Sequence, residues 1–301
     1  MTVTFRIPMT ARFRRVTERA GVLLRGPMGW GEFSPFPEYP DTVAHRWWLA
    51  ALEATVALWP PPVRTSIPIN VTIPAVGPEE AHERVRASGC TTAKVKVAEG
   101  DDAARLEAVR DALGPEGKLR MDVNGAWDTA TAIREIRRFS HLDLEYVEQP
   151  CASTEDLAAV RKAVDVPIAA DESIRLADDP MEVVTGEAAD IAILKVQPLG
   201  GVTRSLELAE QLGLPAVVSS ALETSVGLAA GLHLAACLPE LPFACGLGTI
   251  GLLEHDVVAD PLVPVNGVME LRRPEPELGL VGDPPGSDEL IDRLQRAMDA
   301  G

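Results

Sequence analysis

The spacing of apolar residues divides the chain into a regular central region and two less regular flanks. From Ile67 to about Gly251, short apolar runs of strand length alternate with longer stretches in which apolar residues recur at helical spacing. The runs that predict strands are Ile67–Ile73, Ala93–Val97, Arg120–Val123, Tyr146–Glu148, Ile168–Ala170, Ile191–Lys195, Ala216–Ser219 and Ala244–Gly246. The stretches that predict helices between them include Glu79–Ser88, Asp101–Leu113, Ala130–Phe139, Thr154–Val164 and Val202–Leu212. Strict alternation of strands and helices predicts a parallel sheet, and eight such strands predict a closed (β/α)8-type barrel.

The two flanks predict a smaller unit beside the barrel. Strand-like stretches at Val3–Ile7 and Ala20–Arg25 precede a turn-rich segment and a predicted helix at Thr42–Leu58, which ends at a run of three prolines. Beyond Gly251 the chain is rich in Pro and Gly, so the last barrel helix is expected to be missing or degenerate, as in a modified (β/α)7β barrel. An amphipathic segment at Ser287–Met298 is expected to return to the N-terminal unit. We therefore expect a small α+β capping domain at residues 1–65, completed by residues 270–301, and a barrel domain at residues 66–269.

Composition places the chain among globular proteins. Apolar residues make up 46% of the sequence and charged residues 24%. No run of about 18 uncharged apolar residues predicts a membrane span. The N-terminus has no apolar segment followed by a small-residue cleavage site, and the four cysteines include no Cys-x-x-Cys pair. These features favour a cytoplasmic protein with reduced thiols.

The net charge of −17 argues against nucleic acid as a partner, because binding phosphates requires a basic face. It does not exclude a small anionic substrate, because such a molecule responds to the local field of a pocket or a metal. Solubility alone is a sufficient explanation of the charge. The sequence is compatible with a monomer or a small homo-oligomer.

Ionisable residues recur at or near the carboxyl ends of successive predicted strands. They are Lys96 on the second strand, Asp122 on the third, Glu148 on the fourth, Asp171 on the fifth and Lys195 on the sixth. Each follows the previous one by about one βα unit, and a further lysine two residues before Lys96 shares its face of the strand. Because β/α barrels place their catalytic groups at this end, we expect these side chains to form one ring.

This combination of residue types predicts a metal-assisted proton transfer. Three carboxylates that converge on one point repel each other unless a cation neutralises them, and ligation by oxygen alone suits Mg²⁺. A lysine beside such a site has its pKa lowered by burial and by nearby positive charge, so it can act as a general base. Such a base suits removal of the weakly acidic proton next to a carboxylate, with the metal holding the resulting enediolate.

Each of these residues also has an ordinary structural interpretation. A single Asp or Glu after a strand is commonly a helix N-cap, and a Lys-Val-Lys sequence is commonly part of a surface strand. What favours the catalytic interpretation is their joint occurrence in order, each at a strand end and each one βα unit from the last.

Short motifs surround these positions. They are Lys-x-Lys at 94–96, Asp-x-Asn at 122–124, Glu-Gln-Pro at 148–150, Ala-Asp-Glu-Ser at 170–173 and a lysine on the next strand, at 195. Together they resemble the enolase superfamily, in its muconate-lactonizing subgroup, whose members use a lysine base and a Mg²⁺-stabilised enediolate. Four longer segments, at 29–36, 68–75, 92–99 and 218–228, narrow the resemblance to the o-succinylbenzoate synthases, which are dehydratases of menaquinone biosynthesis.

The resemblance implies a role for each residue of the ring. Lys96 would remove the α-proton and return it to the departing hydroxyl, and the ammonium group of Lys195 would support the enediolate. The remaining roles that the resemblance implies are Mg²⁺ ligation by Asp122, Glu148 and Asp171, auxiliary charge from Lys94, support of the site by Asn124, and contact with the succinyl arm at Ser220 and Gly246. The implied reaction is dehydration of 2-succinyl-6-hydroxy-2,4-cyclohexadiene-1-carboxylate to o-succinylbenzoate.

The first loop of the capping domain closes over the substrate in this family. Here it corresponds to Pro8–Arg15, which is short. Arg12, Arg14 and Arg15 are candidates for contact with a substrate carboxylate, although surface arginines without a role are the commoner explanation.

Other activities share most of these residues. An N-acylamino acid racemase needs the same metal site and a lysine on each face of the α-carbon, so Lys96 and Lys195 fit it equally. A muconate-type cycloisomerase is also compatible with the motifs. Dipeptide epimerases carry an Asp-x-Asp after the last strand, and none occurs near Gly246–Leu252. A barrel that only binds an anion or a protein would not need the full set of lysines and carboxylates.

Overall fold

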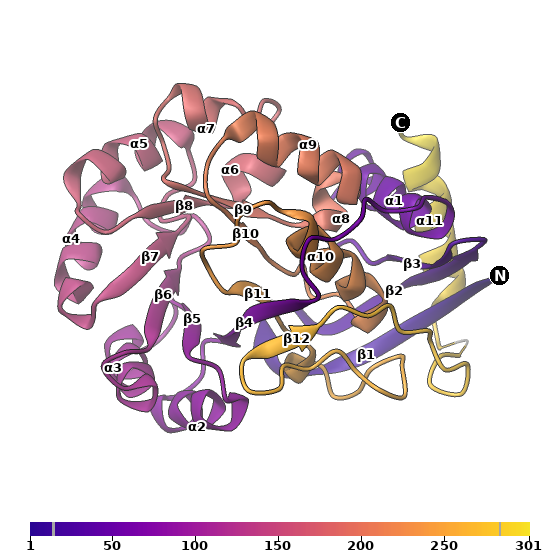
Figure 1. Ribbon diagram of the computed structural model, residues 1–301, viewed down its shortest axis with the longest axis horizontal. Coiled ribbons are helices and arrows are strands. Elements are labelled where there is room, and N and C mark those ends of the chain that lie inside the picture. The colour runs from indigo at the N-terminus through magenta and orange to yellow at the C-terminus, as the bar shows by residue number, and fades with distance from the viewer. Residues whose placement is uncertain (14–15, 283) are drawn as a thin grey trace.

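The computed structural model describes residues 1–13, 16–282 and 284–301, and its largest part is a parallel β-barrel (Figure 1). Eight strands of the described chain form the barrel: β4 (Ser66–Ile73), β5 (Thr92–Lys96), β6 (Lys118–Asp122), β7 (Leu144–Glu148), β8 (Ile168–Ala170), β9 (Ile191–Leu194), β10 (Ala216–Val218) and β11 (Cys245–Gly248). Neighbours in this series from β4 to β10 pair in parallel, and β11 pairs in parallel with β4. A parallel bridge between Ser219 and Gly246 closes the ring between β10 and β11. The predicted barrel is confirmed.

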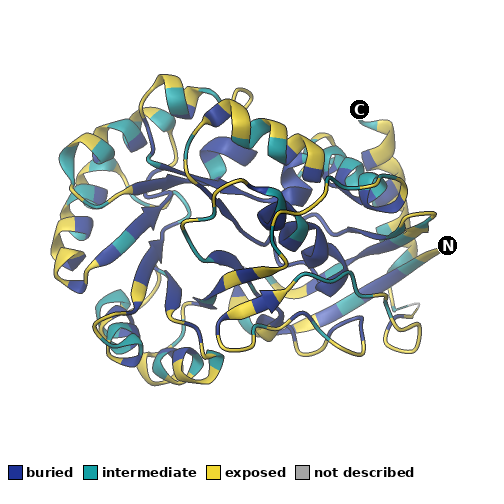
Figure 2. Cartoon of the chain, viewed as in Figure 1, coloured by how far each residue is buried: buried dark blue, intermediate teal, exposed yellow. Residues whose placement is uncertain are grey.

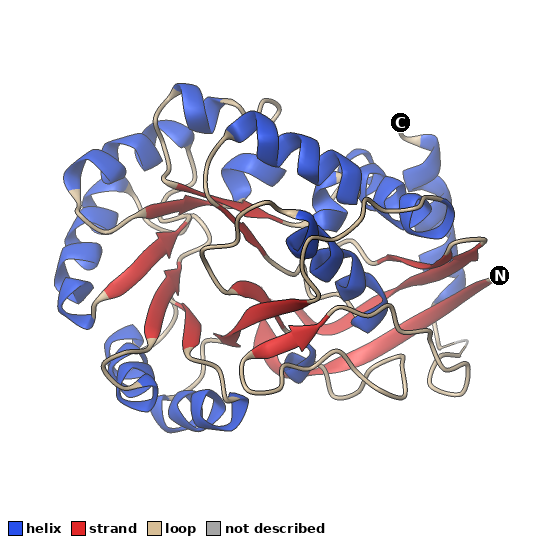
Figure 3. Cartoon of the chain, in the orientation of Figure 1, coloured by secondary structure: helices blue, strands red, loops and turns tan. Residues whose placement is uncertain are grey.

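Helices cover the outside of the barrel (Figure 3). Five of them lie within one residue of their predicted limits: α2 (Pro78–Ser88), α3 (Asp102–Leu113), α4 (Thr129–Phe139), α5 (Thr154–Ala163) and α9 (Val202–Leu212). The side chains of Asp101, Asp128 and Ser153 accept hydrogen bonds from first-turn N–H groups of α3, α4 and α5, which explains where these helices begin. Shorter helical turns are α6 (Glu172–Arg175), α7 (Glu182–Thr185), α8 (Val196–Leu199), η1 (Ser140–Leu142) and η2 (Ile250–Leu252).

Helix α10 (Ser225–Cys237) follows β10 and was not among the helices that the apolar pattern predicted. It packs on the barrel strands β4, β10 and β11 and also on β3 of the small sheet described below. Nearly all of its residues are buried. A helix enclosed in this way has no polar face, so its sequence lacks the one-sided periodicity of a surface helix.

The chain does not form an eighth barrel helix in the described residues between β11 and the C-terminal helix α11 (Ser287–Asp299). Instead, it forms the short turn η2 and the strand β12 (Val268–Glu270), which pairs antiparallel with β4. The predicted (β/α)7β form is therefore confirmed.

A small antiparallel sheet lies beside the barrel. Its strands are β1 (Thr2–Phe13), β2 (Val16–Gly26) and β3 (Gly29–Phe33), and helices α1 (Asp41–Val56) and α11 pack against it. Strand β3 lies in the segment that the sequence identified only as turn-rich. A Cβ atom on Gly31 would lie 2.2 Å from the carbonyl oxygen of Ala51 in α1, so this close packing of helix on strand requires glycine. The proposed boundary between residues 65 and 66 stays a prediction.

The prediction that Pro8–Arg15 forms a loop is wrong for the residues of this segment that the structure describes, 8–13. Residues 8–13 continue β1 as a strand, and a bridge between Met9 and Leu253 joins this strand to the barrel side. The pairing of β1 with β2 resumes at Phe13 and Val16 after a register shift, so antiparallel pairing extends the strand past Pro8. Arg14 and Arg15 lie outside the described residues.

The barrel strands form the buried centre of the molecule (Figure 2). The barrel strands also bury a separate apolar cluster that includes Tyr146, Ile191, Ile193 and Val217, and the buried Arg120 contacts Tyr146 of this cluster. The Arg120 guanidinium donates hydrogen bonds to Glu145 and Asn70 and lies 4.6 Å from the ring centre of Tyr146. Of the helices in the described chain, none has the length and apolar character that a membrane crossing requires.

Candidate active site

The structure brings the predicted ionisable residues together at the carboxyl ends of the strands. Lys96, Asp122 and Glu148 are the last residues of β5, β6 and β7, where Lys96 pairs with Asp122 and Asp122 with Glu148 in the strand register. Asp171 follows β8 directly, and Lys195 follows β9 directly. The βα period of the sequence therefore places all five at one end of the barrel.

Each predicted carboxylate contacts a lysine ammonium group. Lys96 Nζ donates to Asp122 Oδ2 and to Asn124 Oδ1, both at 2.5 Å. Lys94 Nζ donates to both oxygens of Glu148 at 3.0 and 3.1 Å and lies 3.2 Å from Asp122 Oδ2. On the other side of the ring, Lys195 Nζ donates to Asp171 Oδ2 at 2.6 Å.

The two lysines on β5 have opposite pKa shifts. Burial lowers the pKa of Lys96, and the charges of Lys94 and Lys195 lower it further, against the opposing effect of Asp122. Burial also acts to lower the pKa of Lys94, but the charges of Glu148 and Asp122 outweigh it and raise that pKa. Lys96 is therefore suited to give up its proton and act as a base, whereas Lys94 stays a fixed positive charge.

The three carboxylates have the chemistry of a site for a hard divalent cation. Burial and the neighbouring charge of Asp122 raise the pKa of Glu148 to about 7, with Asp171 contributing in the same direction. Bringing a dication among these oxygens would relieve that repulsion, and carboxylate oxygens are the ligands that Mg²⁺ prefers. Within the described residues, no group of three His, Cys, Asp or Glu side chains already surrounds a common point, because lysine ammonium groups contact these oxygens. The donor set fits the metal once those ammonium groups move aside.

Sequence reasoning missed two residues of this site, Glu172 and Arg175. Helix α6 begins immediately after Asp171, and its single turn brings Arg175 Nε to Asp171 Oδ1 at 2.8 Å. Arg175 Nη2 donates to Glu172 Oε1 at 2.6 Å, and Asn124 Nδ2 donates to the same oxygen at 3.2 Å. The available signal was their position directly after the Ala-Asp-Glu-Ser motif at helical spacing.

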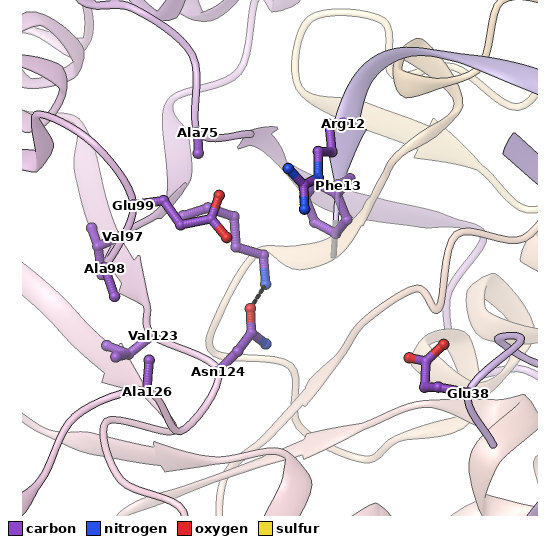
Figure 4. Close-up of a pocket in the computed structure, with 11 residues that line it drawn as sticks. Arg12, Phe13, Glu38, Ala75, Val97, Ala98, Glu99, Val123, Asn124 and Ala126 are labelled. Atoms are coloured by element: carbon purple, nitrogen blue, oxygen red, sulfur yellow. Dashed lines mark hydrogen bonds between the residues drawn. The ribbon is translucent and has the colours of Figure 1, made fainter. Parts of the chain in front are cut away.

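A small chamber lies at the centre of the ring and opens toward a larger cavity. The inner chamber is lined by Phe13, Phe36, Thr72, Lys94, Lys96, Asp122, Lys195, Ser219, Ser220, Ala221, Leu222, Gly246 and Thr249. The outer cavity has a volume of about 370 Å³ and shares Phe13 and Lys96 with the chamber. Figure 4 shows Arg12 and Phe13 on one side of this outer cavity and Ala98 and Ala126 on the other. Lys96 therefore lies where the two spaces meet.

The two residues proposed for the succinyl arm both line the inner chamber. Ser220 Oγ lies 2.6 Å from Glu223 Oε2 and accepts a hydrogen bond from Thr249 Oγ1 at 2.8 Å. A Cβ atom on Gly246 would lie 2.6 Å from Ser219 Oγ, so this wall of the chamber has no room for a side chain. Their role in binding substrate stays a prediction.

Comparison with known proteins places the chain in a family. A model described as enolase C-terminal domain-like matches residues 78–284, and one described as enolase N-terminal domain-like matches residues 4–55. The chain is 62% identical over 274 residues to the o-succinylbenzoate synthase of Thermobifida fusca, a match that covers 89% of this chain and 86% of that protein. It is 48% identical over 300 residues to the o-succinylbenzoate synthase of Mycobacterium tuberculosis, covering 96% of this chain and 91% of that protein. The chain belongs to the o-succinylbenzoate synthase family of the enolase superfamily.

Solved structures of proteins with lower sequence identity share the fold. A dipeptide epimerase from Enterococcus faecalis, in complex with Mg and the dipeptide L-Leu-L-Tyr, aligns with a TM-score of 0.76 at 22% identity, covering 92% of this chain and 97% of that one. At this identity the likeness shows the fold alone. The predicted superfamily and subgroup are confirmed by the closer relatives, whereas the role of each site residue stays a prediction.

In this member of the family, the small sheet supplies two side chains to the site. The Phe13 ring lies 4.9 Å from Lys96 Nζ, so an aromatic face contacts the predicted base. Arg12 lines the outer cavity, and its contact with a substrate carboxylate stays a prediction. Sequence reasoning proposed the arginines of this segment as partners for a carboxylate and missed Phe13, because a single phenylalanine carries no sequence signal for a catalytic site.

Proposed function

We propose that this chain catalyses the divalent-metal-dependent dehydration of 2-succinyl-6-hydroxy-2,4-cyclohexadiene-1-carboxylate to o-succinylbenzoate, a step of menaquinone biosynthesis. The observation that carries the proposal is the presence of Lys96 and Lys195 in one chamber beside three carboxylates, in a chain whose relatives bear the name o-succinylbenzoate synthase. Those relatives support the choice of substrate, and the chamber supports the chemistry.

Lys96 acts as the base and then as the acid. Its lowered pKa makes the neutral amine accessible, and Asp122 and Asn124 hold Nζ in place. The amine takes the proton from the ring carbon that bears the carboxylate, and the electron pair of that bond moves into the carboxylate to form an enediolate. The enediolate then expels the hydroxyl group from the neighbouring ring carbon, and the Lys96 ammonium returns its proton to form water. The ring becomes aromatic, which makes the reaction strongly favourable.

Lys195 supplies charge on the other side of the chamber. Its ammonium group is held by Asp171 Oδ2 and lines the same chamber as Lys96. A fixed positive charge there stabilises the negative charge that develops on the enediolate.

Members of the enolase superfamily use a divalent metal, and we propose Mg²⁺ here. Asp122, Glu148 and Asp171 would hold it, and Lys94 would orient Glu148 and oppose the rise of its pKa. When bound, the metal would supply positive charge to the substrate carboxylate and so favour the enediolate.

An N-succinylamino acid racemase is the second candidate function. The observation that favours it is the placement of two lysines, Lys96 and Lys195, in one chamber, since racemisation needs a base on each face of the α-carbon. The proposed dehydration needs only one base, Lys96, and uses Lys195 for its charge.

We also propose that the protein works in the cytoplasm on a small carboxylate substrate. The four cysteines, Cys90, Cys151, Cys237 and Cys245, are all free thiols, which fits a reducing compartment. A monomeric or small homo-oligomeric state stays a prediction, as does the absence of a nucleic-acid partner.

The experiment incubates purified protein with the cyclohexadiene substrate and follows o-succinylbenzoate formation with Mg²⁺ and with excess EDTA. Turnover that requires the metal supports the proposal. Efficient racemisation of N-succinylamino acids, without dehydration of the cyclohexadiene, would establish the second candidate in its place.

A further inference from the structure

Arg175 uses its whole guanidinium group to join three different side chains. Nε donates to Asp171 Oδ1 at 2.8 Å, Nη1 donates to the Tyr39 hydroxyl at 2.6 Å, and Nη2 donates to Glu172 Oε1 at 2.6 Å. The side chain is only 1% exposed. Because the guanidinium is planar and rigid, these three bonds fix its partners relative to one another.

Arg175 lies in the middle of an unbroken series of hydrogen bonds between the two predicted catalytic lysines. On one side, Asp171 accepts from Arg175 through Oδ1 and from Lys195 through Oδ2. On the other side, Glu172 accepts from both Arg175 and Asn124, and Asn124 in turn accepts from Lys96. A displacement of Arg175 would therefore change the orientation of carboxylates on which both lysines depend.

The third partner, Tyr39, belongs to the segment between β3 and α1. Its ring packs edge-on against Phe36, with ring centres 5.8 Å apart, and tilted against Trp47 of α1, with ring centres 6.3 Å apart. Its carbonyl oxygen accepts a hydrogen bond from Arg293 of α11 at 3.0 Å. Tyr39 is thus fixed by α1 and α11, while its hydroxyl contacts a barrel residue beside the site.

We infer that Arg175 is a positioning residue, which orients Asp171 as a ligand for a divalent cation and links that ligand to the N-terminal unit through Tyr39. The inference rests on the proposed function, since it assumes that Asp171 binds the metal. Arg175 and Lys195 each bind a different oxygen of Asp171 and so hold its carboxylate in one orientation, in which a movement of Lys195 would turn Oδ2 toward a cation. The hydroxyl of Tyr39 then connects metal binding to the docking of α1 and α11.

The test titrates the full-length protein with Mg²⁺ alone, by calorimetry, in the wild type and three variants. Arg175→Lys keeps the charge but has its three donors on one nitrogen, which cannot span partners that bind Nε, Nη1 and Nη2 of the arginine. We expect its Mg²⁺ affinity to fall about 10- to 100-fold, as for other groups that orient metal ligands. Tyr39→Phe keeps the ring and lacks only the hydroxyl, and we expect its Mg²⁺ affinity to fall less, by about three- to tenfold. Arg110→Lys is the control, because this arginine donates only to backbone carbonyls away from the site, and its Mg²⁺ affinity should equal that of the wild type.

Hydrogen exchange supplies a second readout. Mg²⁺ should slow amide exchange in residues 35–41 of the wild type, and Tyr39→Phe should abolish this protection while its urea midpoint stays close to that of the wild type. Unchanged Mg²⁺ affinity in Arg175→Lys would overturn the positioning role, even if that variant were less stable. Full Mg²⁺-dependent protection in Tyr39→Phe would overturn the link to the N-terminal unit.

The proposed function is tested separately from this inference. A wild type that binds Mg²⁺ and shows the expected variant effects, but does not dehydrate the cyclohexadiene, would refute the substrate while leaving the role of Arg175 intact. A wild type that binds no Mg²⁺ at millimolar concentration would refute the inference itself.

Discussion

Glu32 of β3 caps helix α10 through Thr224, whose backbone N–H and hydroxyl donate to one carboxylate oxygen of Glu32 at 3.1 and 2.5 Å. The N–H of Gly227, one turn further along, donates to the same oxygen at 3.0 Å. A negative charge is favourable at this end of a helix, where N–H groups have no partner within the helix. Helix α10 follows the chamber-lining residues Ser220–Leu222, so the contact ties the small sheet to one wall of the chamber.

The burial of this carboxyl group outweighs the hydrogen bonds that it accepts, which act to lower its pKa, and predicts a specific dependence of stability on pH. Burial raises the pKa of Glu32 from 4.5 to about 7, so the folded protein retains a proton that the unfolded chain releases at lower pH. The contribution of this group to the free energy of unfolding is therefore complete below about pH 4.5 and is lost as the pH rises through about 7. In the wild type, this group should lower the free energy of unfolding by about 2 kcal/mol between pH 5 and pH 8. Glu32→Gln cannot titrate, so this decrease should be absent from the variant.

Urea unfolding of the wild type and Glu32→Gln at several pH values in this range measures the effect. The control is Glu289→Gln, at an exposed position. In this variant, the free energy of unfolding should change with pH as steeply as in the wild type. Identical slopes for the wild type and Glu32→Gln would show that Glu32 does not titrate in this range.

The proposed metal site predicts that each carboxylate is needed for binding. Asp122→Asn, Glu148→Gln and Asp171→Asn should each weaken Mg²⁺ binding at least about tenfold, because a neutral amide loses most of its attraction for a hard dication. The barrel should stay folded, since these changes keep side-chain size. Calorimetry showing wild-type Mg²⁺ affinity in all three variants would contradict the assignment.

The sequence predicted the barrel and its ring of ionisable residues because both follow from local regularity. A charged residue at the end of an apolar strand recurs in five successive βα units, and a closed barrel necessarily gathers such positions. Lys96, Asp122 and Glu148 consequently lie at strand ends as expected. The assignment of roles came from the resemblance to the family.

The missed features depend on contacts between distant segments. Helix α10 is covered on all sides by the barrel and the small sheet, so its apolar sequence has no periodic signal. Phe13 reaches Lys96 only because the β1–β2 hairpin extends over the barrel. Tyr39 reaches Arg175 only because α1 packs on the barrel side at α8, where its Arg46 also donates to the Arg175 carbonyl oxygen. These contacts depend on the three-dimensional packing of segments that are far apart in the sequence. The spacing of residues along the chain therefore cannot predict them.

The absence of a side chain at Gly246 should determine the size of the inner chamber. In Gly246→Ala, the added methyl group would lie 2.6 Å from Ser219 Oγ and would push that wall of the chamber toward the substrate. We expect KM for the cyclohexadiene to rise about tenfold or more, while Mg²⁺ affinity is unchanged because no predicted ligand moves. The control is Gly251→Ala, where an added methyl group has nothing within 4 Å. A Gly246→Ala variant with wild-type KM would show that this wall does not contact the substrate.

The two lysines distinguish the dehydratase from the racemase. In a dehydratase, Lys96 handles the proton and Lys195 contributes charge. Lys96→Ala should abolish o-succinylbenzoate formation, because the neighbouring Lys94 has a raised pKa and keeps its proton. Lys195→Arg keeps the positive charge but cannot readily lose a proton, so it should retain some dehydration and lose any racemisation. The measurement is α-proton exchange in deuterated solvent, with an N-succinylamino acid of each hand as the probe. A two-base racemase exchanges both hands in the wild type, and each lysine variant then retains exchange of only one. If the wild-type protein exchanges both hands rapidly and forms no o-succinylbenzoate, then Lys96 and Lys195 serve racemisation, and the proposed dehydration is wrong.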